Sequence, residues 1–121
     1  MTKRTQAHVL NILRKGTVTW YGRGRCLKRY SEKKFERVGA NGQDIFKLHY
    51  NCGICKGWFR DVDEMEVDHI DEVGSFKGDF NEYVERMYCN QENLMAVCIA
   101  CHKLKTGEFN SANNRYERKK L

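Results

Sequence analysis

The stretch LMAVCIACHKLKT, residues 94–106, joins a short apolar run, a CxxC pair and the expected start of a helix. Leu94 to Val97 is apolar throughout and predicts a short strand. We expect the segment from Cys101 through Lys105 to open a final helix. A strand, a tight turn with two thiols and a helix should therefore follow one another here, and the fold has to be built around that unit.

A second CxxC pair lies earlier in the chain, and the two together predict a metal site. At this spacing two thiolates on one tight turn reach the same tetrahedral zinc ion. The alternatives are a redox CxxC or two unrelated buried pairs. Two CxxC pairs in a domain with a small core and a reducing environment favour structural zinc. With four thiolate ligands, the ion would have no open position for catalysis. The expected ligands are Cys52, Cys55, Cys98 and Cys101, while Cys26 and Cys89 are expected to be buried thiols.

The size and composition favour one compact domain. The chain has 121 residues, of which 40% are hydrophobic and 31% charged, so we expect a cross-link such as a metal ion to supplement a modest core. No run approaches the roughly 20 apolar residues of a membrane span, and residues 1–15 do not resemble a secretory signal. We therefore expect a cytoplasmic protein with no membrane partner.

Positive charge is concentrated at the start of the chain. Residues 1–40 hold eleven Lys or Arg against two Glu, whereas the net charge of the whole chain is +6. Such a segment favours binding to a phosphate backbone over binding to an acidic protein, and the remaining alternative is a solvated basic arm. Aromatic residues alternate with bases between residues 20 and 30, which predicts either a nucleic-acid surface or a loop whose aromatic rings pack on the core. The candidate contacts are Arg23, Arg25, Lys28 and Arg29.

Periodicity predicts the other elements of an α+β fold. We expect helices over Thr5–Lys15, around Phe35 and Val38, and over Asp79–Tyr88. We also expect a strand over Ile45–Tyr50 and a hairpin over Asp61–Glu72. The proposed division is a basic helical leader at residues 1–44, a core at 45–110 and a basic tail at 111–121.

Three short motifs lie between and after the cysteine pairs: Val67-Asp68-His69-Ile70, Glu92-Asn93-Leu94, and Cys101-His102-Lys103-Leu104-Lys105-Thr106. Each is weak alone. Their order resembles the HNH nuclease family, with its CxxC, DHI, NL and CxxCHxxKT pattern. The resemblance covers residues 52–106, and residues 78–89 look like the insertion of small phage-encoded HNH proteins.

This resemblance implies a ββα-metal fold and DNA cleavage to 5′-phosphate and 3′-hydroxyl ends. His69 would be the general base, since imidazole titrates near neutral pH. Asp68 and His102 would hold one Mg²⁺ or Mn²⁺, with Ni²⁺ or Co²⁺ tolerated. Asn93 would orient the loop that carries the base. Adjacent residues of a strand point to opposite faces, so we predict a strand end or bulge at Asp68 and His69.

Lys105 lies three residues after His102, on the same helix face, where it would reach a phosphate or remain a solvated lysine. The expected partner is double-stranded DNA, with phage DNA-processing or packaging proteins as further partners, and the expected state is a monomer or weak dimer. For a phage-encoded chain the compartment would be the host cytoplasm. Two other functions remain open: a zinc-stabilised DNA-binding module that cuts nothing, and a small protein-interaction module.

Overall fold

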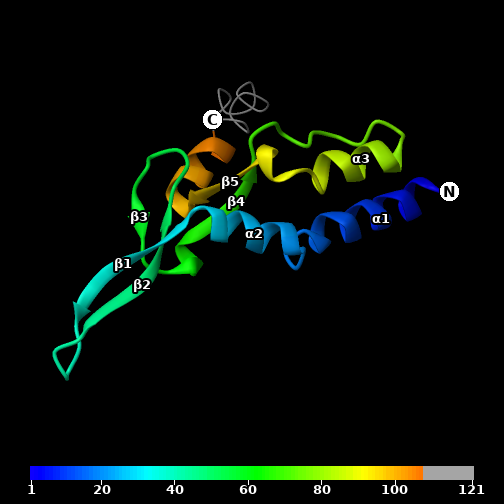
Figure 1. The fold of residues 1–121 in the computed structure, drawn as a ribbon. Helices are drawn as coiled ribbons and strands as arrows, with labels where there is room; N and C mark the ends of the chain where they lie inside the picture. Colours follow the sequence, from blue (N-terminus) through cyan, green and yellow to red (C-terminus); the bar gives the residue numbers. More distant parts are fainter. Residues whose placement is uncertain (108–121) are drawn as a thin grey trace.

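In a computed structural model that describes residues 1–107, the chain combines α-helices with two antiparallel sheets (Figure 1). One sheet has three strands, in the order β1 (Ser31–Val38), β2 (Asp44–Asn51) and β3 (Trp58–Phe59). The other has two, β4 (Met65–His69) and β5 (Leu94–Cys98). The predicted α+β class is therefore confirmed.

The sheet of β4 and β5 forms the centre of the molecule with the helix that follows it. The strands pair antiparallel from Met65 opposite Cys98 to His69 opposite Leu94, and a helix covering 99–107 follows β5 directly. Apolar side chains of β5 are buried because this sheet packs against the rest of the core. The predicted strand at Leu94–Val97 and the helix after it are both confirmed.

Two helices form a second, smaller core at the N-terminal end of the molecule. α1 (Lys3–Gly16) and α3 (Phe80–Met87) lie side by side (Figure 1) and bury Leu10 against Tyr83 and Met87. Arg14 Nε donates to the Tyr83 hydroxyl at 3.2 Å. Asp79 caps α3 by accepting hydrogen bonds from the amides of residues 81 and 82, which explains where this helix begins. Both predicted helices are confirmed.

Residues 21–29 form a helix, α2 (Tyr21–Arg29). The sequence predicts either a loop or a nucleic-acid surface for this segment. Its inner face buries Cys26 and Leu27 in the central core. Gly22 lies beneath the Trp20 ring, where any added Cβ would collide with the indole. Glycine lowers helix propensity, but it is required at position 22 because only glycine leaves room for the Trp20 ring over the start of α2.

The predicted helix around Phe35 and Val38 is wrong, because these residues belong to β1. The strand pairs antiparallel with β2, with Phe35 opposite Phe46, and the two rings are 6.1 Å apart. The register shifts between Phe35 and Arg37, and the Glu36 side chain there is only 6% exposed and ion-paired with Lys47 and Arg60. Pairing with β2 thus overrides a local pattern that also suits a helix.

The predicted hairpin within Asp61–Glu72 is also wrong. A short 3-10 turn, η1 (Val62–Glu64), precedes the single strand β4, and the partner of β4 is β5. A second such turn, η2 (Gln91–Asn93), leads into β5. The apolar alternation in this segment therefore marks one strand with a distant partner.

Residues 31–51 project from the body as an arm made of β1 and β2 (Figure 1). The sequence-based division placed β1 in the leader (1–44) and nearly all of β2 in the core (45–110), and the structure pairs these two strands. The predicted tail at 111–121 lies outside the described residues. Within residues 1–107 no helix has the length and apolar character needed to cross a membrane.

Candidate functional site

Four cysteine side chains meet where the two sheets come together. Their Sγ atoms all lie within 4.8 Å of one another. Zn–S bonds of about 2.3 Å in a tetrahedron put sulfurs about 3.8 Å apart, so this spacing fits one zinc ion. Cys52 and Cys55 come from the turn between β2 and β3, Cys98 ends β5, and Cys101 lies in the following helix. The donor set is the one predicted from the sequence.

Backbone amides surround the sulfurs and favour their ionised form. The amides of Ile54 and Cys55 lie 3.4 and 3.5 Å from Cys52 Sγ, and the Cys101 amide lies 3.4 Å from Cys98 Sγ. Burial alone would raise the pKa of Cys52, but amide hydrogen bonds from Cys98, Cys55 and Ile54 outweigh it and lower the pKa to about 6.

Cys101 behaves in the opposite way. A hydrogen bond with the Cys98 side chain, burial and the other thiols raise its pKa to about 12. Four adjacent sulfurs cannot all carry negative charge unless a cation neutralises them. The chemistry of the cluster therefore matches a thiolate-bound divalent ion.

Asp68 is a largely buried carboxylate near the end of β4, and its partner is Lys105 from the helix at 99–107. Lys105 Nζ lies 2.6 Å from Asp68 Oδ2, 2.8 Å from the carbonyl oxygen of His69 and 3.4 Å from Glu72 Oε1. Burial alone would lower the pKa of Lys105, but Asp68 and then Glu72 outweigh this and raise it. The lysine therefore remains charged and neutralises the Asp68 carboxylate.

His69 is the last residue of β4, so the strand ends where the sequence required an end or a bulge. Its ring Nε2 lies 2.7 Å from the carbonyl oxygen of Met87, at the end of α3. A carbonyl only accepts hydrogen bonds, so Nε2 must carry the proton in this contact. In the neutral ring, Nδ1 is then the unprotonated nitrogen, able to accept a proton.

The His69 side chain also lines a hollow of about 170 Å³ between β4 and the chain that joins α1 to α2. Arg23 and Glu66 both line this hollow, 3.8 Å apart, so a positive and a negative side chain face it together. The hollow therefore carries no net charge from this pair.

Asn93, at the end of η2, holds the loop that follows His69. Its Oδ1 accepts a hydrogen bond from the Asp71 amide at 2.8 Å, and its Nδ2 donates to the Asp71 carbonyl at 3.3 Å. Its own carbonyl accepts from the Ile70 amide at 2.8 Å. These three bonds fix the backbone immediately after the histidine.

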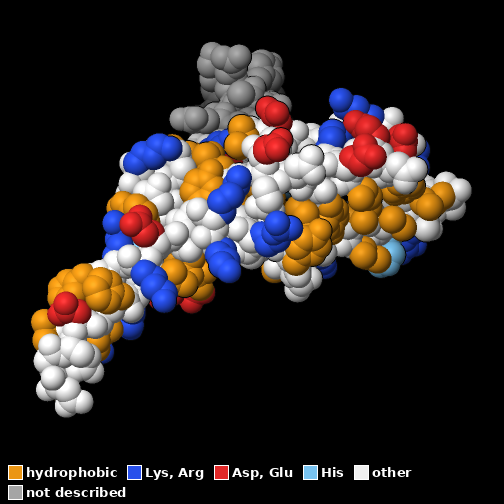
Figure 2. Space-filling model, in the orientation of Figure 1, with side chains coloured by type: hydrophobic (Ala, Val, Ile, Leu, Met, Phe, Trp, Pro, Cys, Tyr) orange, Lys and Arg blue, Asp and Glu red, His pale blue; other side chains and the backbone are white. Residues whose placement is uncertain are grey.

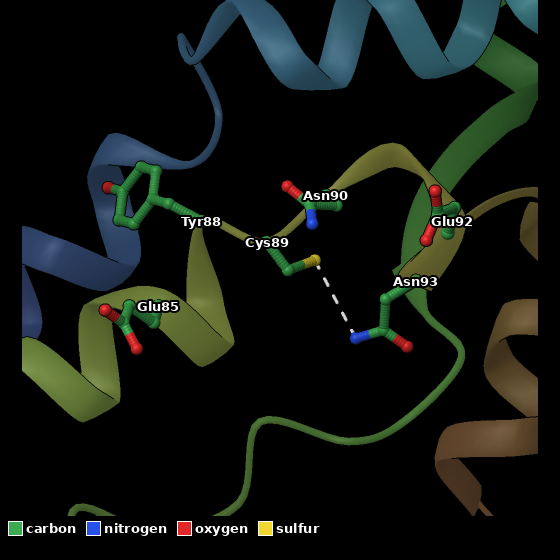
Figure 3. A pocket seen from close by; sticks show the side chains of 6 residues that line it. All are labelled: Glu85, Tyr88, Cys89, Asn90, Glu92 and Asn93. Atoms are coloured by element: carbon green, nitrogen blue, oxygen red, sulfur yellow. Dashed lines mark hydrogen bonds between the residues drawn. The ribbon is translucent and has the colours of Figure 1, made fainter.

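The other side of Asn93 borders an open hollow of about 420 Å³ (Figure 3). Figure 3 shows the Asn93 amide directed toward Cys89, whose Sγ is 3.7 Å away. Glu85 and Glu92 also line the hollow. Two carboxylates disfavour a phosphate there, so this hollow is a poor candidate for a nucleic-acid site despite its size.

His102 lies one helical turn before Lys105 and is half-buried. Residues three apart share a helix face, so His102 lies on the face that brings Lys105 to Asp68. Among residues 1–107, the four cysteines are the one set of three or more ligating side chains close enough to share an ion. Asp68 and His102 belong to no such set within these residues.

The four basic candidates on α2 differ in what they contact. Arg29 NH2 donates to the carbonyls of Gln91 and Leu94 at 2.8 and 2.9 Å, so its guanidinium is used within the fold. Arg25 and Lys28 are exposed. Figure 2 shows Lys and Arg side chains spread over the face that α2 and the base of the arm present. Positive side chains on an exposed surface attract a phosphate backbone.

The sequence did not indicate three groups around this site: the Met87 carbonyl, the Glu72 carboxylate and the pairing of Lys105 with Asp68. Each depends on elements far apart in the chain, and no local pattern marks them.

Comparisons with protein-family models, with curated proteins and with solved structures found no match for this chain.

Proposed function

We propose that this chain is a metal-dependent HNH-type endonuclease that hydrolyses phosphodiester bonds in DNA. The observation that carries the proposal is the contact between His69 Nε2 and the Met87 carbonyl, 2.7 Å long, at the end of the strand that also carries Asp68. It leaves Nδ1 as the proton acceptor, which is the state a general base needs.

The arrangement of β4, β5 and the helix at 99–107 supports the proposal. It follows the strand–strand–helix order that the sequence resemblance implies. The four-cysteine cluster holds the end of β5 and the start of the helix together through Cys98 and Cys101. Asp68 and His69 leave β4 on opposite faces, so a phosphate that meets both must lie across the strand end.

Asp68 and His102 are the proposed ligands of a catalytic Mg²⁺ or Mn²⁺. A carboxylate oxygen and an imidazole nitrogen suit such an ion, and the helix that bears His102 packs over Asp68 through Lys105. When bound, the cation supplies positive charge to the phosphate as a Lewis acid.

The remaining chemistry belongs to the residues of this chain. His69 Nδ1 takes a proton from the attacking water, whose oxygen bonds to phosphorus while the bond from phosphorus to the 3′ oxygen breaks. The 3′ oxygen takes a proton from solvent, which gives 5′-phosphate and 3′-hydroxyl ends. Asn93 keeps the loop after His69 in place through its two side-chain bonds to Asp71. Arg25 and Lys28 hold the duplex by its backbone.

The test is incubation of zinc-loaded protein with supercoiled plasmid in Mg²⁺, in Mn²⁺ or in EDTA. Wild type should nick or linearise the plasmid only with the metal ion. His69→Ala should lose cleavage while it binds the duplex as well as wild type, because the ring is not part of the basic surface. Cleavage by His69→Ala at the wild-type rate would refute the assignment.

One observation favours a second function, a zinc-stabilised DNA-binding module that does not cut. The Lys105 ammonium already neutralises Asp68, so this carboxylate does not need a metal ion for its burial. In that case folded, zinc-loaded wild type would bind plasmid and leave it intact with every divalent ion.

A further inference from the structure

The ion pair between Lys105 and Asp68 places one cation where the proposed function requires another. We propose that Lys105 is a tethered competitor of the divalent metal ion: it neutralises Asp68 in the metal-free protein and is displaced toward phosphate when the ion binds. This inference rests on the proposed function, and it assigns Lys105 a role that acts through Asp68.

The geometry prevents the Lys105 ammonium and a divalent ion from both making a close contact with the Asp68 carboxylate. The ammonium contacts Asp68 Oδ2 at 2.6 Å, and the His69 carbonyl and Glu72 also face it. Asp68 is only 9% exposed, so little water is available to screen a second cation beside the same carboxylate. An ion bound to Asp68 would therefore repel the ammonium at close range.

Glu72 explains how Lys105 can leave Asp68 and remain at the site. Its carboxylate is 3.4 Å from Lys105 Nζ, and its side chain is 47% exposed, nearer to solvent than that of Asp68. A lysine side chain is flexible along its four-carbon stem. The ammonium can thus turn about its contact with Glu72 toward the surface, where a DNA phosphate would accept it.

Exchange of partners couples the two ligands. Metal binding would release Lys105 for phosphate, and phosphate binding to Lys105 would leave Asp68 open for the metal ion. By linkage each ligand then strengthens the other. The sequence expectations of metal on Asp68 and phosphate on Lys105 thus describe one arrangement, and the ion pair between Lys105 and Asp68 is the alternative to it.

Mn²⁺ titration of zinc-loaded protein without DNA tests the inference, with free Mn²⁺ followed by electron paramagnetic resonance. Lys105→Met should bind Mn²⁺ at least about ten-fold more tightly than wild type, because the competing charge is gone. Lys105→Gln removes the charge but can still donate a hydrogen bond to Asp68, and it should shift the affinity in the same direction. Lys103→Met, an exposed lysine of the same helix, is the matched control and should leave the affinity unchanged.

Asp68→Asn in each background identifies the Mn²⁺ bound at Asp68, and zinc content with circular dichroism verifies the fold. Equal or weaker Mn²⁺ binding by both folded Lys105 variants would overturn the inference. If wild type still nicks plasmid with Mn²⁺, the nuclease proposal survives that result. Absence of Mn²⁺ binding at Asp68 in every variant, together with absence of nicking, would overturn both.

Discussion

Loss of the four-cysteine cluster and its proposed zinc ion should remove a large part of the folding free energy. The cluster fastens the turn between β2 and β3 to the end of β5 and the next helix, and 42 residues, 56–97, lie between Cys55 and Cys98. Closing a loop of that length by a cross-link removes about 4 kcal/mol of chain entropy from the unfolded state at 25 °C. The whole free energy of unfolding of a small domain is about 5–15 kcal/mol.

Cys98→Ser is the perturbation, because Cys98 is both a proposed ligand and the last residue of β5. The free energy of unfolding should fall by about 4 kcal/mol, which moves a guanidinium midpoint by roughly 1 M. Guanidinium unfolding followed by far-ultraviolet circular dichroism measures this change, and elemental analysis counts zinc per chain.

Cys89→Ser is the matched control, since Cys89 is a half-buried thiol outside the cluster. It should retain one zinc per chain and nearly wild-type stability. Wild type purified with much less than one zinc per chain, or Cys98→Ser as stable as wild type, would refute the reasoning.

Three further variants separate structural from functional contacts. Asn93→Ala removes both side-chain bonds to Asp71 and should lower the free energy of unfolding by about 1–3 kcal/mol, with a slower cleavage rate and unchanged DNA affinity; an unchanged rate would exclude Asn93 as an orienting residue. Arg25→Ala with Lys28→Ala should weaken duplex binding and reduce the slope of log K against log salt by about 2, measured by fluorescence anisotropy; a wild-type slope would move the DNA surface elsewhere. Arg29→Ala should instead lower stability by about 1–3 kcal/mol in thermal unfolding, because it loses its bonds to the Gln91 and Leu94 carbonyls; a loss of DNA affinity without loss of stability would contradict its structural role.

The parts of the fold that follow a local rule were predictable from the sequence. Apolar residues at helical spacing predicted α3, and the apolar run Leu94–Val97 predicted β5. The CxxC spacing gave the four cysteines that the structure brings together. In each case a local pattern marks the residues, although the meeting of the two CxxC pairs spans the 42 residues between Cys55 and Cys98.

The errors share a physical cause, which is pairing between distant segments. β1 takes its conformation from β2, and β4 takes its partner from β5 across residues 70–93. Alternation in the sequence does not say which strand will be the partner. Lys105 meets Asp68 for the same reason: the helix at 99–107 is placed by β5 and the cysteine cluster, 37 residues after the aspartate.

The state of the cleaved ends tests the central claim most directly. Zinc-loaded wild type with Mg²⁺ should convert supercoiled plasmid to nicked circles or linear molecules, and DNA ligase should rejoin the cut ends, because the ends are 5′-phosphate and 3′-hydroxyl. EDTA should prevent nicking, and Asp68→Asn should abolish it. Intact plasmid after incubation with folded, zinc-loaded wild type, or nicks that ligase does not reseal, would contradict the account.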